Sequence, residues 1–220
     1  MYLKNFLASS VGQKFLVALT GLGLSGFVLM HMSGNMLLLV GAEAYNKYAH
    51  AMITNPLIIP AEIGLVVMFL LHMSVALKIN WDNRAARGTG PGRRPSNSDK
   101  DARFASRYMV LTGVLTFVFL VLHLISFKYG TYYETELHGE KVRDLYRLVA
   151  EEFHKPLFVA WYVFAMLILF AHLAHGFSAV FQTLGLASVR NCTVKKLGWT
   201  FAAVVAGGFI SQPLYFFFFN

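Results

Sequence analysis

The chain has 220 residues, of which 56% are hydrophobic and 14% are charged, a composition typical of membrane proteins rather than soluble domains. Its single cysteine, Cys192, excludes an internal disulfide and a Cys-x-x-Cys motif, so any iron–sulfur cluster that works with this chain must belong to another polypeptide. The net charge of +8 does not indicate nucleic-acid binding, because the positions of the charges relative to the membrane explain it.

Five stretches are long and apolar enough to cross a hydrocarbon core of about 30 Å as helices. In chain order they cover residues 15–40, 56–79, 108–127, 157–181 and 197–219. Between the second and third, residues 80–106 are rich in Gly, Pro, Ser and charge, and we expect an irregular cytoplasmic loop there. The outer segment 129–156 differs, because apolar residues recur at helical spacing from Lys141 to Phe153 and predict a short amphipathic helix. We expect residues 1–220 to form one membrane domain.

The basic residues divide unequally between the two sides of the predicted spans. Thirteen of the nineteen Lys and Arg residues fall on the side of the amino terminus. The other six are Lys47, Lys128, Lys141, Arg143, Arg147 and Lys155. Because cytoplasmic loops carry the excess of basic residues, the sequence predicts an inner amino terminus and an outer carboxyl terminus.

Four of the five spans carry a histidine, although polar groups in hydrocarbon are costly and are usually functional there. Counting about 1.5 Å per residue from the inner ends of the spans places His31 and His123 in the outer half of the membrane. The same count places His72 and His172 in the inner half, with His175 about 4.5 Å from His172 along the same helix and competing with it. The remaining histidines, His50, His138 and His154, lie in predicted outer connections and are interpreted as ordinary solvated side chains.

Two imidazoles that face each other across a helix bundle are what a six-coordinate haem iron requires. Gly34, Ala76 and Gly176 lie one turn from three of the histidines and would leave room for a macrocycle. The alternative is that each histidine hydrogen-bonds a neighbouring helix. The pairing by depth favours an all-α fold with a haem-binding four-helix core, a fifth helix and two haem b groups.

This pattern resembles the five-helix, dihaem cytochrome b membrane anchor of succinate:quinone oxidoreductases, the succinate dehydrogenases and fumarate reductases. The resemblance covers nearly the whole chain and rests on four segments, HMSGNMLLLVGAEAYNKYA, LHMSVALKINWDNRAAR, LHLISFKYG and HLAHGFSAVFQTLG. It implies that His31 and His123 hold the haem far from the soluble subunits and that His72 and His172 hold the near one. In the family a glycine follows the fourth ligand by four positions, as Gly176 follows His172. His175 would then contact a haem propionate or lie near an inner quinone.

The resemblance also implies partners and a location. A flavoprotein and an iron–sulfur protein would dock on the cytoplasmic face of a bacterial inner membrane, and the succinate site would lie on the flavoprotein. Electrons would pass from succinate through flavin, clusters, inner haem and outer haem to menaquinone or ubiquinone. Glu62, the only acidic residue inside a predicted span, is a candidate for proton exchange with the quinone, or else a snorkelling or helix-terminal carboxylate. Asn35 would bond a haem propionate or a neighbouring backbone.

Two other functions remain open at the level of sequence. A dihaem anchor of a hydrogenase or formate dehydrogenase would have the same haems and a different soluble partner. A proton-coupled transporter would use the histidines as a relay, and it would be expected to have discontinuous helices or inverted repeats.

Overall fold

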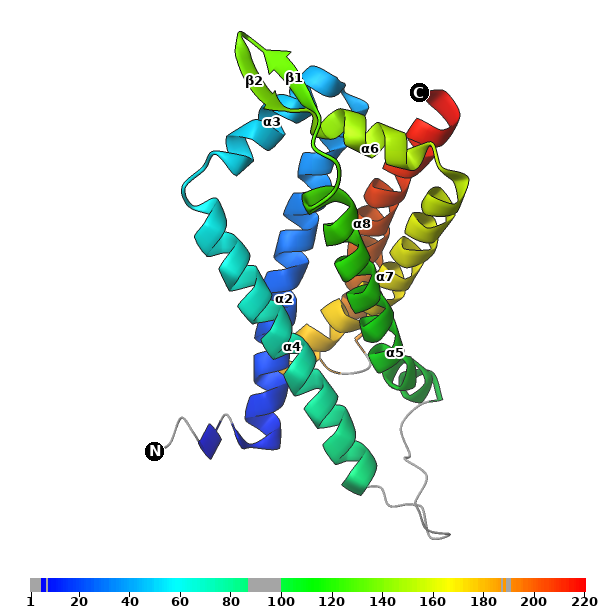
Figure 1. Cartoon of the computed structure of the whole chain (residues 1–220). Helices are drawn as coiled ribbons and strands as arrows, with labels where there is room; N and C mark the ends of the chain where they lie inside the picture. Colours follow the sequence, from blue (N-terminus) through cyan, green and yellow to red (C-terminus); the bar gives the residue numbers. More distant parts are fainter. Residues whose placement is uncertain (1–4, 7, 87–99, 187, 189–190) are drawn as a thin grey trace.

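A computed structural model of the chain describes residues 5–6, 8–86, 100–186, 188 and 191–220. Five long helices dominate it, and each is long and apolar enough to cross a membrane, which confirms the five predicted spans. They are α2 (Ser10–Asn35), α4 (Ile58–Ala86), α5 (Lys100–His123), α7 (Pro156–Thr183) and α8 (Cys192–Phe219). The start of α2 and the carboxyl terminus lie at opposite ends of the bundle, as an odd number of crossings requires (Figure 1).

The predicted loop 80–106 is shorter than expected. Helix α4 continues to Ala86 and α5 begins at Lys100, so both ends of the predicted loop are helical. Helical backbone hydrogen bonds continue past the apolar stretch of α4, where Lys78 pairs with Asp82 one turn later at 2.5 Å. The remainder of the predicted loop, residues 87–99, lies outside the described residues.

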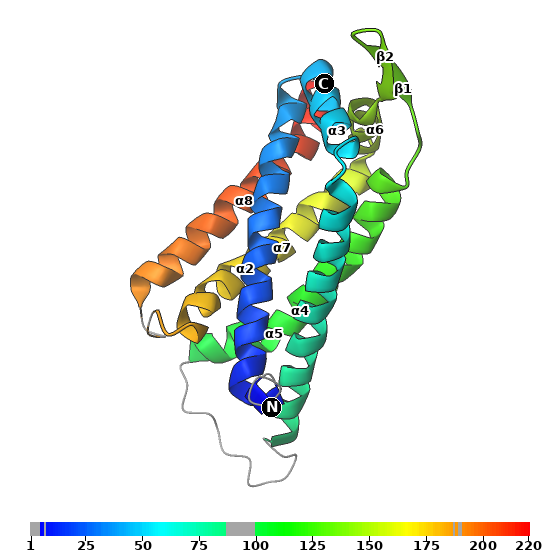
Figure 2. The same cartoon turned by 90° about the vertical axis from the view of Figure 1, so that its left-hand side faces the viewer.

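Four of the spanning helices form a ring. Helix α2 packs against α4 and α7, and α5 packs against the same two helices from the other side. Consequently α2 lies diagonally opposite α5, and α4 lies diagonally opposite α7. Helix α8 stands outside this ring and runs beside α7 along most of its length (Figure 2). The observed fold is therefore a four-helix bundle with a fifth helix that packs mainly against α7 and also against α2.

Small residues bring α7 and α8 together. Small residues recur at every fourth position of α8, namely Gly198, Ala202 and Ala206; both alanines are buried, and Ala202 packs against α7. At Gly198 the helices approach so closely that a Cβ atom would lie 2.7 Å from the carbonyl oxygen of Ala174. Such small-residue contacts drive helix association in membranes, where lipid is as apolar as the helix surfaces.

The outward faces of the bundle are apolar. On α4 the exposed side chains include Ile59, Ile63, Val66, Val67 and Leu70. In water a continuous surface of this kind would cause aggregation, whereas in a bilayer it faces lipid tails. The composition of this surface and the lengths of the five helices identify a multi-pass membrane protein.

Short elements cap the end of the bundle that contains the carboxyl terminus (Figure 1). A 3₁₀ turn (Met36–Leu39) joins α2 to α3 (Ala42–Ile53), and a hairpin of β1 (Glu134–Leu137) and β2 (Glu140–Arg143) precedes α6 (Leu145–Phe153). The predicted amphipathic helix is confirmed from residue 145 to residue 153 and is wrong from 141 to 144. Asp144 begins the helix instead, because its side chain accepts a hydrogen bond from the backbone N–H of Arg147 at 3.0 Å.

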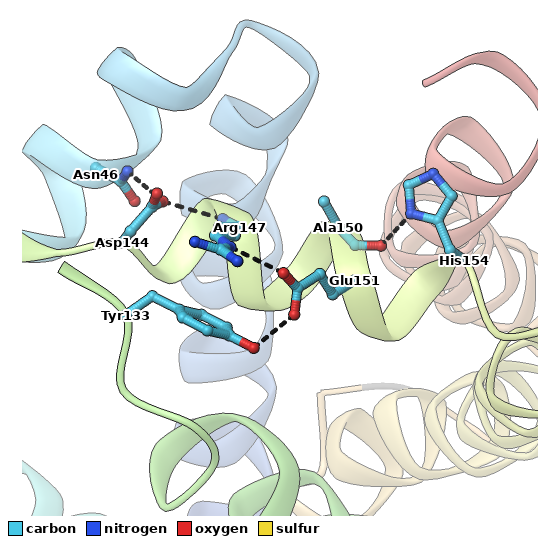
Figure 3. Close-up of polar contacts among 7 residues, drawn as sticks. All are labelled: Asn46, Tyr133, Asp144, Arg147, Ala150, Glu151 and His154. Carbon is cyan, nitrogen blue, oxygen red and sulfur yellow. Dashed lines mark hydrogen bonds and ion pairs between the residues drawn. The ribbon is translucent and has the colours of Figure 1, made fainter. Parts of the chain in front are cut away.

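A buried asparagine joins the two helices of the cap (Figure 3). The Asn46 side chain on α3 is 2% exposed, and its amide nitrogen donates to the Asp144 carboxylate at 2.8 Å. Its amide oxygen accepts from the backbone N–H of Tyr146 at 3.0 Å. One side chain therefore satisfies a carboxylate and an orphan N–H at the start of α6.

Along α6, Glu151 connects the helix to the segment before the hairpin (Figure 3). Its carboxylate accepts from the Tyr133 hydroxyl at 2.6 Å and from Arg147 Nε at 2.8 Å. These two hydrogen bonds, the Tyr133 bond first, lower the pKa of Glu151 below its ordinary value of 4.5. Polar contacts therefore link α6 both to α3 and to the segment before the hairpin.

Candidate functional site

The outer histidines come together across the bundle. His31 on α2 and His123 on α5 lie on diagonally opposite helices, and their ring centroids are 5.9 Å apart with the planes inclined at 87°. Metal–imidazole bonds are about 2.0–2.1 Å long, which puts the centres of two imidazoles on opposite sides of one metal roughly 6 Å apart. The spacing of this pair fits that requirement.

Aromatic side chains surround the outer pair. Phe27 stacks on the His31 ring at 5.5 Å, and Phe119 and Phe127 lie at 5.6 and 5.4 Å from the His123 ring. Beyond Phe127, an apolar cluster of the cap and the bundle ends includes Phe153 of α6. The cap therefore shields the outer pair from water.

Polar contacts at the outer pair differ between its two members. The Tyr162 hydroxyl lies 3.1 Å from Nδ1 of His123. Near His31, the Asn35 amide donates to the His31 carbonyl oxygen at 2.8 Å, and its oxygen accepts from the Tyr45 hydroxyl at 3.0 Å. Of the two roles considered for Asn35, the contact observed is the one to neighbouring backbone.

The inner histidines are also on diagonally opposite helices, His72 on α4 and His172 on α7. His72 lies against α2, and His172 lies against α5. His72 Nδ1 is 3.2 Å from the carbonyl oxygen of Val17, and His172 Nδ1 is 3.2 Å from Oγ1 of Thr112. The ring of His175 has no comparable contact to another helix among the described residues.

These contacts fix which ring nitrogen of His72 carries the proton. The Val17 carbonyl can only accept, so Nδ1 must donate to it. Thr20 Oγ1 is also 3.2 Å from Nδ1, and its own proton is directed to the Leu16 carbonyl oxygen at 2.7 Å. In the neutral imidazole, Nε2 then keeps the lone pair that a metal would use.

The two histidine pairs occupy two levels. Gly21 of α2 contacts the His72 ring, and His31 follows Gly21 by ten residues on the same helix. Ten residues of α-helix extend about 15 Å. On α5, Gly113 contacts the His172 ring and His123 follows it by the same interval. The inner and outer levels are thus about 15 Å apart along both helices.

The surroundings of Gly34 and Gly176 differ, and the room that they would leave for a macrocycle stays a prediction. A Cβ atom at Gly34 would meet the Tyr48 side chain of α3, so this glycine lets α3 approach α2. At Gly176 the nearest neighbour is Met109 Cε at 3.8 Å. The glycines that contact imidazoles are Gly21 and Gly113, which the sequence analysis did not select.

Glu62 lies at the outer end of α4, where it forms an ion pair with Lys128. Lys128 ends a π-helical turn (Leu124–Lys128) that follows His123 directly. Such turns are uncommon and occur frequently at functional sites. The carboxylate is therefore partly exposed, ion-paired and near the outer histidine level, and its predicted exchange of protons with a quinone stays a prediction.

The donor sets of the two levels restrict what they could bind. Among the described residues, no group of three or more His, Cys, Asp and Glu side chains is placed to hold a metal ion by itself. Each level offers two imidazoles from opposite helices, which is the axial ligand set of a haem whose macrocycle supplies the other four nitrogens. The residues present therefore fit a haem better than a bare metal ion.

Comparisons with protein-family models, with curated proteins and with solved structures found no match to this chain.

Proposed function

We propose that this protein is the cytochrome b membrane anchor of a succinate:quinone oxidoreductase, and that it passes electrons between an iron–sulfur subunit and membrane quinone through two b haems. The observation that carries the proposal is that four histidines lie at two levels of one bundle, His31 in ring contact with His123 across it, and His72 and His172 on the other two diagonally opposite helices. His31 and His123 would hold the outer haem, and His72 and His172 the inner one. A haem held by two imidazoles supplies one-electron transfer without binding a further ligand.

The residues of the chain itself would have three tasks. The four imidazoles would bind and orient the haems, and the contact of His72 Nδ1 with the Val17 carbonyl keeps Nε2 of that ring available. The aromatic cluster beneath the cap excludes water from the outer level. Glu62, paired with Lys128, would exchange protons with quinone at the outer surface. Soluble subunits would dock on the inner face, next to the basic residues.

Continuous helices make a transporter less suitable as an explanation. In transporters that work by alternating access, substrate sites are commonly formed where spanning helices are interrupted at mid-membrane. Within the described residues, α2, α4, α7 and α8 run unbroken, and the π-helical turn of α5 lies at its outer end. A dihaem anchor of another quinone-linked enzyme has the same bundle, so the identity of the soluble subunits that copurify distinguishes it.

Single histidine substitutions test the proposal. The complex would be purified in mild detergent from a host making b haem, and the ratio of haem to protein would be measured together with a redox titration. His31→Ala and His123→Ala should each remove the outer haem, and His72→Ala and His172→Ala should each remove the inner one. His138→Asn is the control, because this exposed hairpin residue has a φ of 51° that asparagine also adopts.

Two results would exclude the proposal, and two others would revise it. A wild-type complex without protohaem would exclude it, and so would retention of both haems in all four variants. Retention of both haems in His172→Ala with loss of one in His175→Ala would transfer the fourth ligand to His175. Copurification of hydrogenase or formate dehydrogenase subunits would retain the haem chemistry and change the enzyme.

A further inference from the structure

Two segments of the bundle have the same sequence and the same relation to histidine. Residues 19–21 of α2 and 111–113 of α5 both read Leu-Thr-Gly, and in each helix the outer histidine follows the glycine by ten residues. Each segment contacts the inner histidine of a neighbouring helix, His72 in one case and His172 in the other. A tripeptide found twice, at the same distance from the same kind of residue, indicates a shared task.

The threonine of each segment holds one ring nitrogen. Thr20 Oγ1 and Thr112 Oγ1 each lie 3.2 Å from Nδ1 of their histidine. Each hydroxyl directs its own proton to a carbonyl of its own helix, at 2.7 Å for Thr20 and 3.1 Å for Thr112. Both hydroxyls can therefore accept from the imidazole, and at His72 the Val17 carbonyl, 3.2 Å from the same nitrogen, requires that Nδ1 carry the proton.

The glycine of each segment lies against the edge of the same ring. A Cβ atom at Gly21 would be 3.0 Å from Cε1 of His72, and a Cβ atom at Gly113 would be 3.4 Å from Cε1 of His172. The first distance requires the imidazole to shift by a few tenths of an ångström, whereas the second is an ordinary van der Waals contact. A Cβ atom would therefore displace the imidazole at Gly21 and would only fill the space beside it at Gly113.

We propose that the two Leu-Thr-Gly segments are equivalent seats that position the ligand imidazoles of the inner haem. The threonine fixes the proton on Nδ1 and so leaves Nε2 for the iron, and the glycine leaves space for the ring. This inference rests on the proposed function, because it assigns the seats to a haem. Thr20, Gly21, Thr112 and Gly113 are positioning residues, since they contact the imidazoles and are not themselves ligands.

The seats have an electronic consequence as well. An imidazole whose Nδ1–H donates a hydrogen bond is a stronger electron donor to a metal, which favours the ferric state and lowers the midpoint potential. The outer pair uses different neighbours, Tyr162 and Asn35. The seats therefore contribute to a difference in potential between the two levels of the bundle.

Threonine substitutions in the purified complex test the seats. Thr20→Val and Thr112→Val keep the shape of the side chain and remove the acceptor. Each should raise the midpoint potential of the inner haem, change its low-spin electron paramagnetic resonance signal and weaken its binding by about 10–100-fold. Thr20→Ser and Thr112→Ser should restore all three properties. Thr116→Val is the matched control, because the Thr116 hydroxyl donates to the carbonyl of Thr112 at 2.8 Å.

The glycines provide a second, independent measurement. Gly21→Ala should perturb the inner haem more than Gly113→Ala, in the order of the two Cβ distances. The outer haem of the same sample reports on folding, and the His31→Ala background assigns the inner signal. The inference is overturned if both Thr→Val variants match Thr116→Val in potential and haem retention, or if they lose both haems together. A wild-type complex without haem overturns the proposed function itself, whereas the former results leave that function standing.

Discussion

Replacing Asn46 with alanine should loosen the outer cap without unfolding the spanning helices. The substitution removes the hydrogen bond to the Asp144 carboxylate and leaves the backbone N–H of Tyr146 without its partner. A hydrogen bond to a charged group contributes about 1.5–3 kcal/mol, and a buried donor left unpaired costs about 1–3 kcal/mol. Because one side chain makes both contacts, the two costs overlap, and we expect local destabilisation of at least about 2 kcal/mol.

Hydrogen exchange measures this local opening directly. At about 1.4 kcal/mol per factor of ten, a loss of 2 kcal/mol accelerates exchange about 30-fold. The acceleration should be confined to the amides of α6 and α3, because segments of a protein open with their own free energies. Amides in the middle of α7 should exchange at the wild-type rate, and a haem held by His31 and His123, as proposed, should become more accessible to small reductants.

Asn55→Ala is the matched control for this substitution. Asn55 is exposed, and its side chain accepts one hydrogen bond from the nearby backbone N–H of Leu57 at 2.9 Å. It should change exchange in the cap by less than about tenfold, since a local exposed hydrogen bond contributes about 0.5–1.5 kcal/mol. If Asn46→Ala accelerated exchange in α6 no more than Asn55→Ala does, the buried asparagine would not be what joins α3 to α6.

Gly198→Leu should overpack α8 on the Ala174 carbonyl, at a cost of about 1–3 kcal/mol, and so lower the midpoint of unfolding in mixed detergent micelles. Gly207→Leu is the control and should leave that midpoint unchanged, because no atom lies within 4 Å of a Cβ atom at Gly207. Glu151 stabilises the cap above its unfolded-state pKa, and this contribution is lost as pH falls through its lowered folded-state pKa. Hydrogen exchange in α6, corrected for intrinsic rates, should therefore accelerate below about pH 4.5. A flat pH profile of exchange would contradict this. Glu62→Gln should slow quinone turnover with both haems bound, measured as the rate per haem, and an unchanged rate would leave Glu62 with a structural role.

The spanning helices could be predicted from sequence because length and hydropathy are local properties. The missed elements depend on distant residues instead. Helix α3 is polar on average, and it is held by Asn46, whose partner Asp144 is 98 residues further along the chain. The first residues of the predicted outer helix form strand β2 because Val142 pairs with Thr135 of β1. No periodicity within a single segment reveals such pairings.

For the candidate site, depth counting paired His31 with His123, and the observed contact of their rings agrees with that pairing. The neighbours of Nδ1 could not be predicted in the same way. A threonine in a helix ordinarily bonds a carbonyl of its own preceding turn, as Thr116 does. Thr20 and Thr112 make that bond and accept from a second helix as well, and only the packing of α2 on α4 and of α5 on α7 creates the second contact.

One pattern in the sequence does indicate this arrangement, namely Leu-Thr-Gly followed ten residues later by histidine, in α2 and again in α5. It implies that these two helices are equivalent, each contributing an outer histidine and a seat for an inner one. The equivalence ends at the outer level, where His31 has Asn35 as its polar neighbour and His123 has Tyr162 and a π-helical turn. The inner level is therefore built by the bundle alone, whereas the outer level also depends on the cap. Substitutions that loosen the cap should consequently affect the outer pair first.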